Sequence, residues 1–266
     1  MNIYYTFPQG KTKVLTLSYD DGRKADRRLV EIFNQYGIRA TFNINGDLLG
    51  KPDRIEKNEV STLYHGHEIA THAYTHPMIT RCPMVQLTRE IMEDRKVLEK
   101  LTGGIIRGHA YPFGVYNEEI KDLFSKLGIV YARTTRSTEK FDLPLDWMEW
   151  NATCHHNQNL MKHAKNFVDS KKSRYLKCMY VWGHSYEFDE QNNWELIEDF
   201  CQYISDRKDI WYATNIEIRD YIEACKNLQF STNQSTIYNP NAISIWLNVN
   251  DEIVEVAAGK MITCSE

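Results

Sequence analysis

The chain lacks the features that mark three common functional classes. No apolar run among its 266 residues approaches the roughly 18 that a membrane helix needs. The first 13 residues contain no basic segment followed by an apolar one, so we expect no secretory signal. Lys and Arg form no dense stripe, and the net charge is only -4. The sequence therefore predicts a cytoplasmic protein with neither nucleic acid nor a membrane as partner.

The cysteines also argue against an extracellular framework, because none of the six forms a CxxC pair. They are scattered as Cys82, Cys154, Cys178, Cys201, Cys225 and Cys264. This pattern is typical of reduced thiols in the cytosol rather than of a disulfide-linked domain.

Strand-like and helix-like segments alternate along most of the chain, in roughly seven βα units with short links. Such alternation predicts parallel strands wound into a barrel or an open sheet, in a domain spanning 1–230. The expected helices include 24–36, 53–64 and 83–101. A polar stretch near 231–235 precedes two strand-like runs joined at Asn250-Asp251, which predicts a hairpin. We expect 231–266 to be a small β appendage, packed on the main domain or pairing with another subunit.

The first chemical signal is a pair of carboxylates, Asp20-Asp21, that follows a short apolar strand and precedes Gly22. In βα proteins, the loops at the carboxyl ends of strands carry the chemistry. An Asp-Asp-Gly sequence is equally typical of a tight turn with no function.

The second signal is His72 and His76, whose H-x3-H spacing is seen in zinc sites because residues four apart on a helical turn face the same way. Two surface histidines also occur at this spacing by chance. A catalytic zinc site has three protein ligands and an open position, so either Asp20 or Asp21 supplies the third ligand. The combination favours metal-assisted hydrolysis, in which the second aspartate acts as a base.

Hydrolysis of an amide also needs a proton for the leaving nitrogen. His184 ends the most apolar strand, which makes it the best candidate for a general acid. The alternative is a core histidine bonded to the backbone.

These residues resemble five ordered motifs of the NodB-homology polysaccharide deacetylases, carbohydrate esterase family four. The resemblance covers about residues 12–225, and its fold is a distorted (β/α) barrel. The stretches that carry it surround Asp20-Asp21, His72 and His76, residues 110–114, Asp146-Trp147, and His184. The resemblance implies that Asp20 is the base, that Asp21, His72 and His76 bind the metal, and that His184 is the acid. It also implies that Phe113 offers its backbone N–H to the oxyanion, that Asp146 tunes His184, and that Trp147 or Trp150 walls the site, with Tyr111 as a further substrate contact.

Two departures from the family pattern stand out. The family usually has an arginine two residues before the motif proline, where this chain has Ala110, so Arg107 becomes the candidate that orients Asp20. Trp182 replaces the usual leucine two residues before His184, which predicts a smaller or differently shaped acyl pocket and a further substrate contact.

Three weaker signals remain. His65 and His67 are interpreted as structural. One of His155 and His156 is a candidate for substrate contact, and the sequence supplies no clear ligand set for a second metal. Tyr186, Glu187 and Asp189 either bind sugar hydroxyls or form a solvated loop.

The sequence therefore predicts a metal-dependent hydrolase that removes an N-acyl group, in the first place N-acetyl, from an amino sugar or a soluble saccharide. Zn2+ is the expected ion, and Co2+ or Ni2+ would accept the same ligands. Two alternatives stay open: a hydrolase of non-sugar C–N bonds, such as cyclic amides, and a carbohydrate-binding protein without turnover.

Overall fold

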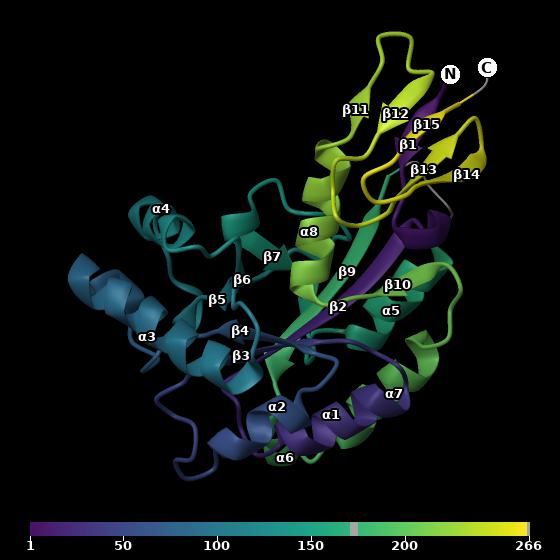
Figure 1. Cartoon of the computed structure of the whole chain (residues 1–266). Coiled ribbons are helices and arrows are strands. Elements are labelled where there is room, and N and C mark those ends of the chain that lie inside the picture. The colour runs from purple at the N-terminus through teal and green to yellow at the C-terminus, as the bar shows by residue number, and fades with distance from the viewer. Residues whose placement is uncertain (171–174, 265–266) are drawn as a thin grey trace.

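A nearly closed barrel of parallel strands forms the body of the protein in a computed structural model that describes residues 1–170 and 175–264 (Figure 1). This confirms the expected α/β barrel class. The barrel strands are β2 (Lys13–Asp20), β3 (Thr41–Ile44), β4 (Glu68–Thr71), β5 (Gly108–Ala110), β6 (Tyr131–Ser137), β7 (Trp150–Ala152), β8 (Cys154–His155), β9 (Lys177–His184) and β10 (Ile210–Tyr212).

The strand order explains how the barrel closes. Neighbouring strands follow the path β7-β6-β5-β4-β3-β2-β9-β8, and β10 pairs with the first half of β2. β7 and β8 are two halves of one stretch, separated only by Thr153, so the first and last strands of the path are joined covalently. The sequence interpretation contained no strand at 150–155, although this segment bridges β6 and β9.

Helices surround the strands and bury one face each. They are α1 (Asp26–Gln35), α2 (Val60–Leu63), α3 (Met84–Thr102), α4 (Glu118–Lys126), α5 (Leu160–Asp169), α6 (Tyr186–Glu190), α7 (Trp194–Ile204) and α8 (Asn215–Lys226). In α1, for example, Leu29, Val30, Ile32 and Phe33 are buried at helical spacing. Every residue of β2 is buried, as expected for a central parallel strand covered on both faces.

The helix expected at 53–64 is largely wrong. Its first part is irregular, Asp53 has a positive φ of 60°, and the regular helix α2 covers only Val60–Leu63. Arg54 donates a hydrogen bond to the carbonyl of Asp21, so this segment is tied to the end of β2 rather than wound into a helix.

Two small antiparallel sheets lie at one end of the barrel (Figure 1). One contains β1 (Ile3–Tyr5), β13 (Ile245–Val249) and β14 (Glu252–Val256), and the other contains β11 (Gln229–Phe230), β12 (Thr236–Tyr238) and β15 (Met261–Thr263).

The predicted hairpin is confirmed, because β13 and β14 pair around Asn250 and Asp251, which both have positive φ as a tight hairpin turn requires. β1 joins this sheet from the opposite end of the sequence. A separate unit at 231–266 and its pairing with another subunit stay predictions.

Among the described residues, no helix combines the length and the apolar character needed to cross a bilayer.

Candidate active site

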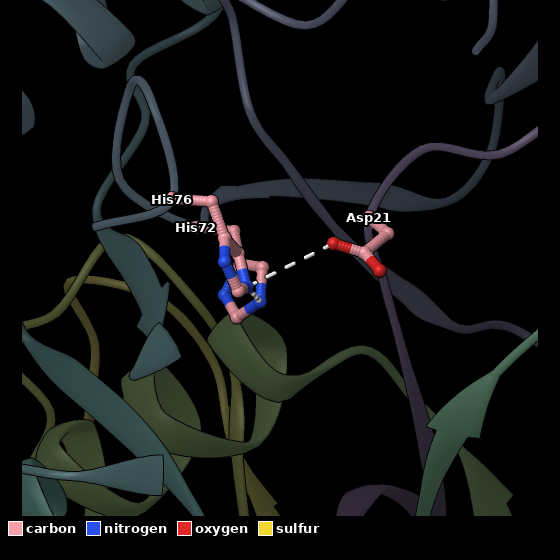
Figure 2. A group of neighbouring side chains, drawn as sticks. All are labelled: Asp21, His72 and His76. Carbon is pink, nitrogen blue, oxygen red and sulfur yellow. Dashed lines mark hydrogen bonds and ion pairs between the residues drawn. The ribbon is translucent and has the colours of Figure 1, made fainter. Parts of the chain in front are cut away.

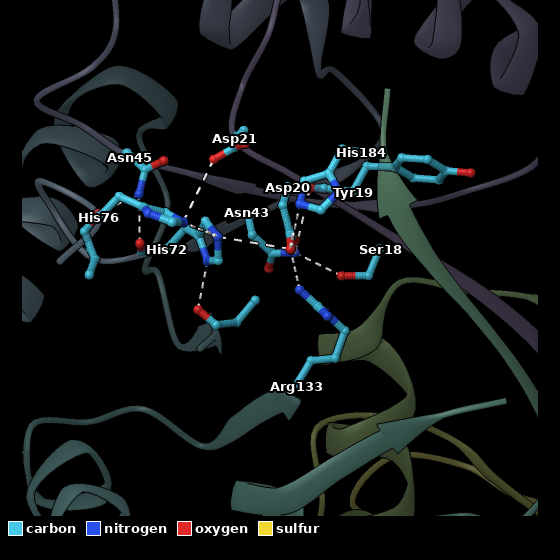
Figure 3. A network of polar contacts seen from close by, with 12 residues as sticks. Ser18, Tyr19, Asp20, Asp21, Asn43, Asn45, His72, His76, Arg133 and His184 are labelled. Atoms are coloured by element: carbon cyan, nitrogen blue, oxygen red, sulfur yellow. Dashed lines mark hydrogen bonds and ion pairs between the residues drawn. The ribbon is translucent and has the colours of Figure 1, made fainter. Parts of the chain in front are cut away.

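The polar side chains gather at the carboxyl ends of β2, β4 and β9 (Figure 3). Asp20 is the last residue of β2, and its register partners on the two flanking strands are Asn43 and His184. His72 directly follows β4. Because the carboxyl ends of parallel strands share one rim, motifs that are far apart in sequence converge there.

Asp21, His72 and His76 face one another across a short gap (Figure 2). The Nε2 atoms of the two histidines are 3.2 Å apart, and Nε2 of His76 lies 3.9 Å from Oδ1 of Asp21. Of the two aspartates that the sequence offered as a third ligand, Asp21 completes a group whose ligand atoms all lie within 4.8 Å of one another.

The protonation state of these histidines suits a cation. Nδ1 of His72 lies 2.7 Å from the carbonyl oxygen of Ala110, so Nδ1 carries the proton and Nε2 presents a lone pair to the gap. Burial lowers the pKa of His72 below its usual value. Burial, and to a smaller extent the neighbouring His72 ring, lowers the pKa of His76 to about 4. Both rings are therefore neutral near pH 7, and the set of two imidazoles and a carboxylate fits a divalent ion.

The histidine loop is held by buried polar groups. Nδ2 of Asn45 donates to the carbonyls of His72 and Ala73, at 2.6 and 2.7 Å. The carboxylate of Asp94 accepts hydrogen bonds from the backbone N–H groups of His72 and Gly46. Ala73 and His76 both adopt positive φ, near 59°, and the hydrogen bond from Asn45 to the Ala73 carbonyl holds the first of them.

Asp20 lies beside this group and is buried. Its carboxylate accepts hydrogen bonds from Asn43, at 2.8 Å, and from the guanidinium of Arg133. Burial raises the pKa of Asp20, but the electrostatic effect of Arg133, with smaller effects of His72 and His184, is stronger and brings the pKa to about 2. Asp20 is thus a buried carboxylate that stays ionised at neutral pH.

His184 has one ring nitrogen toward Asp20 and the other toward Glu187. Nε2 lies 3.9 Å from Oδ2 of Asp20, and Nδ1 lies 3.2 Å from Oε1 of Glu187. Burial lowers the pKa of His184, but the hydrogen bond to Glu187 and the charge of Asp20 outweigh it, so the pKa lies above 6.5. A proton on this ring is therefore stabilised from both sides.

The expectation that Arg107 orients Asp20 is corrected. Arg107 donates two hydrogen bonds to Asp220, and Arg133 binds Asp20 instead. Arg133 is fully buried near the start of β6, after the apolar run 129–132. A charged residue inside such a strand is rarely buried without a partner, and this signal could have identified it.

The expectation that Asp146 tunes His184 is also corrected. Asp146 lies 2.6 Å from the ammonium of Lys121 and accepts from the backbone N–H of Met148, whereas His184 pairs with Glu187.

Two of the proposed substrate contacts are wrong because their side chains are completely buried. Trp150 packs against Tyr131, Tyr180 and Trp147 in the core, and the Tyr111 hydroxyl donates to the carbonyl of Met148. Trp147 is half-buried, and its indole donates to Glu223.

Two other predicted residues do lie at the site. The Phe113 ring is 56 % exposed and contacts His76 edge-on, with ring centroids 4.6 Å apart. Trp182 packs under the guanidinium of Arg133, at 4.5 Å, and its ring lies edge-on to His155.

A second group of histidines surrounds Glu187. Nε2 of His155 and Nε2 of His156 lie 3.1 and 3.0 Å from Oε2 of Glu187. The sequence interpretation left Glu187 as a sugar ligand or a loop residue and did not link it to these histidines. His67, interpreted as structural, accepts a hydrogen bond from the backbone N–H of Ala40, and His65 is exposed.

Comparisons with known proteins point in the same direction. The sequence model of the polysaccharide deacetylase family matches residues 8–132. A chitooligosaccharide deacetylase from Rhizobium leguminosarum bv. phaseoli is 26% identical over 109 residues, which cover 40% of this chain and 47% of that protein. The chain thus spans about half the length, or less, of the first curated relatives it matches.

Solved structures share the fold at low sequence identity. A putative polysaccharide deacetylase from Mycobacterium smegmatis superposes with a TM-score of 0.64 at 15% identity, over 84% of this chain and 94% of that one. A family 4 acetyl xylan esterase from Clostridium thermocellum, in complex with a cobalt ion, gives 0.55 at 14% identity over 77% and 89%. The family match thus places residues 8–132 of this chain in the polysaccharide deacetylase family, and the fold shared with the solved structures agrees with it.

Proposed function

We propose that this protein is a metal-dependent hydrolase that removes an N-acyl group, in the first place N-acetyl, from an amino sugar or an oligosaccharide. The observation that carries the proposal is the convergence of the Asp21, His72 and His76 ligand atoms beside an ionised Asp20, with His184 next to that carboxylate. The chitooligosaccharide deacetylase relative supports an acylated saccharide as the substrate class.

A divalent cation would be held by Asp21, His72 and His76. When bound, it would supply Lewis acid chemistry to the attacking water and to the acyl oxygen. Zn2+ suits this donor set best, and Co2+ and Ni2+ are chemically acceptable alternatives.

The residues of the chain carry the proton transfers. Asp20 accepts a proton from water as the water oxygen bonds to the acyl carbon. His184 gives its Nε2 proton to the amide nitrogen as the C–N bond breaks, which leaves acetate and a free amine. Arg133 and Asn43 hold the carboxylate of Asp20 in place.

The remaining element is an oxyanion donor. The backbone N–H of Phe113 is our candidate, because this residue has a positive φ of 58° and its side chain contacts His76. Such a donor contributes roughly 3 kcal/mol in other acyl-transfer enzymes.

The test measures acetate release from N-acetylglucosamine oligomers by purified protein, before and after chelation and with Zn2+, Co2+ or Ni2+ restored. We expect activity that is lost on chelation and regained with the ion. Asp20→Asn should reduce kcat by about 100- to 10,000-fold while leaving metal content unchanged. Asp122→Asn, which alters a surface ion pair on α4, is the matched control and should keep full activity.

Unchanged activity in Asp20→Asn would falsify the general-base assignment. A wild-type protein that binds sugar, contains the ion and releases no acetate would instead favour the carbohydrate-binding alternative.

A second substrate class deserves the same assay because of Trp182. Its large ring lies 5.8 Å from the His184 ring, at the position where the family usually has leucine. Such a wall favours a compact acyl group or a flat cyclic amide over a bulky one. Release of products from cyclic ureides, with none from acetylated sugars, would replace the sugar assignment.

A further inference from the structure

His184 lies in a cluster whose centre is the Glu187 carboxylate on α6. Three imidazoles from β8, β9 and the residue after β8 approach it. Oε1 is 3.2 Å from Nδ1 of His184, and Oε2 is 3.1 Å from Nε2 of His155 and 3.0 Å from Nε2 of His156. The backbone N–H of His184 also reaches Oε2, at 3.4 Å. One carboxylate thus contacts both the side chain and the backbone of the proposed acid.

Two histidines and a glutamate within 4.8 Å also meet the distance criterion for a metal site. The hydrogen bonding of His155 argues against one. Nδ1 of His155 accepts a hydrogen bond from the backbone N–H of Asn157, at 3.2 Å, so the proton of the neutral ring is on Nε2. That Nε2 faces Glu187 as an N–H donor and has no lone pair to offer an ion. His155 therefore meets the Glu187 carboxylate with an N–H group and not with a lone pair.

The surroundings fix these rings in place. His156 is fully buried, stacks on Phe188 with ring centroids 4.2 Å apart, and lies nearly parallel to Tyr19, at 5.8 Å. The backbone of Gly183 passes so close that a Cβ there would come within 2.0 Å of Nδ1 of His156. The ring of His155 packs edge-on against Trp182. Glu187 is thus contacted by two rings that are themselves packed against aromatic side chains.

We propose that Glu187 is the positioning residue of the proposed acid. It holds Nδ1–H of His184 so that Nε2 points at the leaving nitrogen, and His155 and His156 fix its carboxylate. The inference rests on the proposed hydrolytic function and names the group that takes the place expected for Asp146. The electrostatics of Glu187 agree with this positioning role. Burial raises the pKa of Glu187, but hydrogen bonds from the three imidazoles outweigh this and keep its pKa well below the usual value.

The role predicts a dependence on the leaving group. When the C–N bond of an N-acetyl sugar breaks, the amine nitrogen takes a proton from Nε2 of His184. The 4-nitrophenolate released from 4-nitrophenyl acetate is stable as an anion and takes none. A residue that acts through the acid therefore affects the first reaction and spares the second, whereas loss of fold or of the metal affects both.

The experiment compares Glu187→Gln with the wild type on both substrates, and Glu190→Gln on the exposed end of the same helix is the control. We expect Glu187→Gln to lose about 10- to 100-fold in kcat on an N-acetylglucosamine oligomer, with KM changed less than twofold. On 4-nitrophenyl acetate it should stay within threefold of the wild type. Glu187→Asp should recover part of the loss, and Glu190→Gln should match the wild type on both.

Equal losses on the two substrates, or no loss on either, would overturn the positioning role while leaving the hydrolase assignment intact. A wild-type protein inactive on both substrates would overturn the hydrolase assignment, and the positioning role with it. Metal content measured in parallel tests whether the Glu187 cluster binds a second ion. If the wild type holds two ions and Glu187→Gln holds one, the cluster is a metal site and the positioning role is wrong.

Discussion

Two groups of histidines around a carboxylate lie near each other at the barrel rim, and they differ in where the ring protons are. In the first, Nδ1 of His72 donates to a backbone carbonyl, which leaves the Nε2 lone pair directed at His76 and Asp21. In the second, Nδ1 of His155 accepts from a backbone N–H, which places the proton on Nε2, facing Glu187. Nearly the same side chains thus suit a cation in one place and a proton in the other.

The comparison teaches that residue types and distances do not by themselves identify a metal site. Both groups have ligand atoms within 4.8 Å. The hydrogen bond on the far nitrogen of each ring decides the tautomer and hence the chemistry. His184 and Asp20 connect the two, since Nδ1 of His184 faces Glu187 and its Nε2 faces Asp20.

The largest expected effect, on metal content and activity, comes from replacing one histidine in each group, and it tests whether the two groups differ. His76→Gln should lower metal content from about one ion per chain to nearly none and reduce kcat/KM by more than about 1,000-fold, because the cation and its Lewis acidity are lost. His155→Gln should keep the ion. Metal analysis after dialysis measures both, and loss of metal in His155→Gln alone would contradict our distinction.

A smaller effect is expected at the arginine that binds Asp20. Arg133→Met leaves a buried carboxylate without its cation, so we expect a loss of about 10- to 100-fold in kcat and a destabilisation of about 3 kcal/mol. Arg107→Met removes a partly exposed ion pair with Asp220 and should change stability by less than about 1 kcal/mol and leave activity unchanged. Kinetics and thermal unfolding provide the readout, and equal effects of the two variants would refute the assignment of Arg133.

The dependence of kcat on pH tests how the second group acts on His184. Asp20, with a pKa of about 2, is ionised throughout the working range, so in the proposed mechanism the alkaline limb reports His184, the acid that has to be protonated. The titratable groups that act on His184 or contact its ring include Asp20, Asp21, Tyr186, Glu187, His155 and His156.

We expect activity to fall as pH rises through the raised pKa of His184, and Glu187→Gln should move this limb to lower pH. A limb that does not move in kcat against pH would contradict the contact between Glu187 and His184.

The smallest effect on activity is expected from packing behind the second group. Gly183→Ala places a Cβ against His156, so we expect a destabilisation of about 1–3 kcal/mol and a few-fold loss of kcat. Gly104→Ala is the control, since the nearest atom to its Cβ would be 3.8 Å away. Chemical denaturation measures both, and equal stability of the two variants would show that His156 is free to move.

The sequence predicted those parts of the site that local patterns encode. Asp20, Asp21, His72 and His184 each follow or end a strand, and parallel strands bring such ends together whatever the rest of the chain does. The barrel class and the terminal hairpin were predictable for the same reason, because strand and turn patterns are local.

The features that the sequence interpretation did not predict depend on contacts between segments that are distant in sequence. Arg133 is 113 residues from Asp20, and although a charged residue after an apolar run indicates a buried partner, the local pattern does not say which residue that partner is. His155 reaches Glu187 only because residues 150–155 bridge β6 and β9, a closure that short, irregular strands conceal in the sequence. At 53–64 the contact between Arg54 and Asp21 overrides the helical pattern.

The most direct test of the account is an anomalous diffraction map of crystals grown with Co2+ or Zn2+. We expect one strong peak, bonded to Asp21, His72 and His76, with no density for an ion among His155, His156 and Glu187. A peak in the second group, or none in the first, would contradict the claim that ring tautomers separate a metal site from a proton site in this barrel.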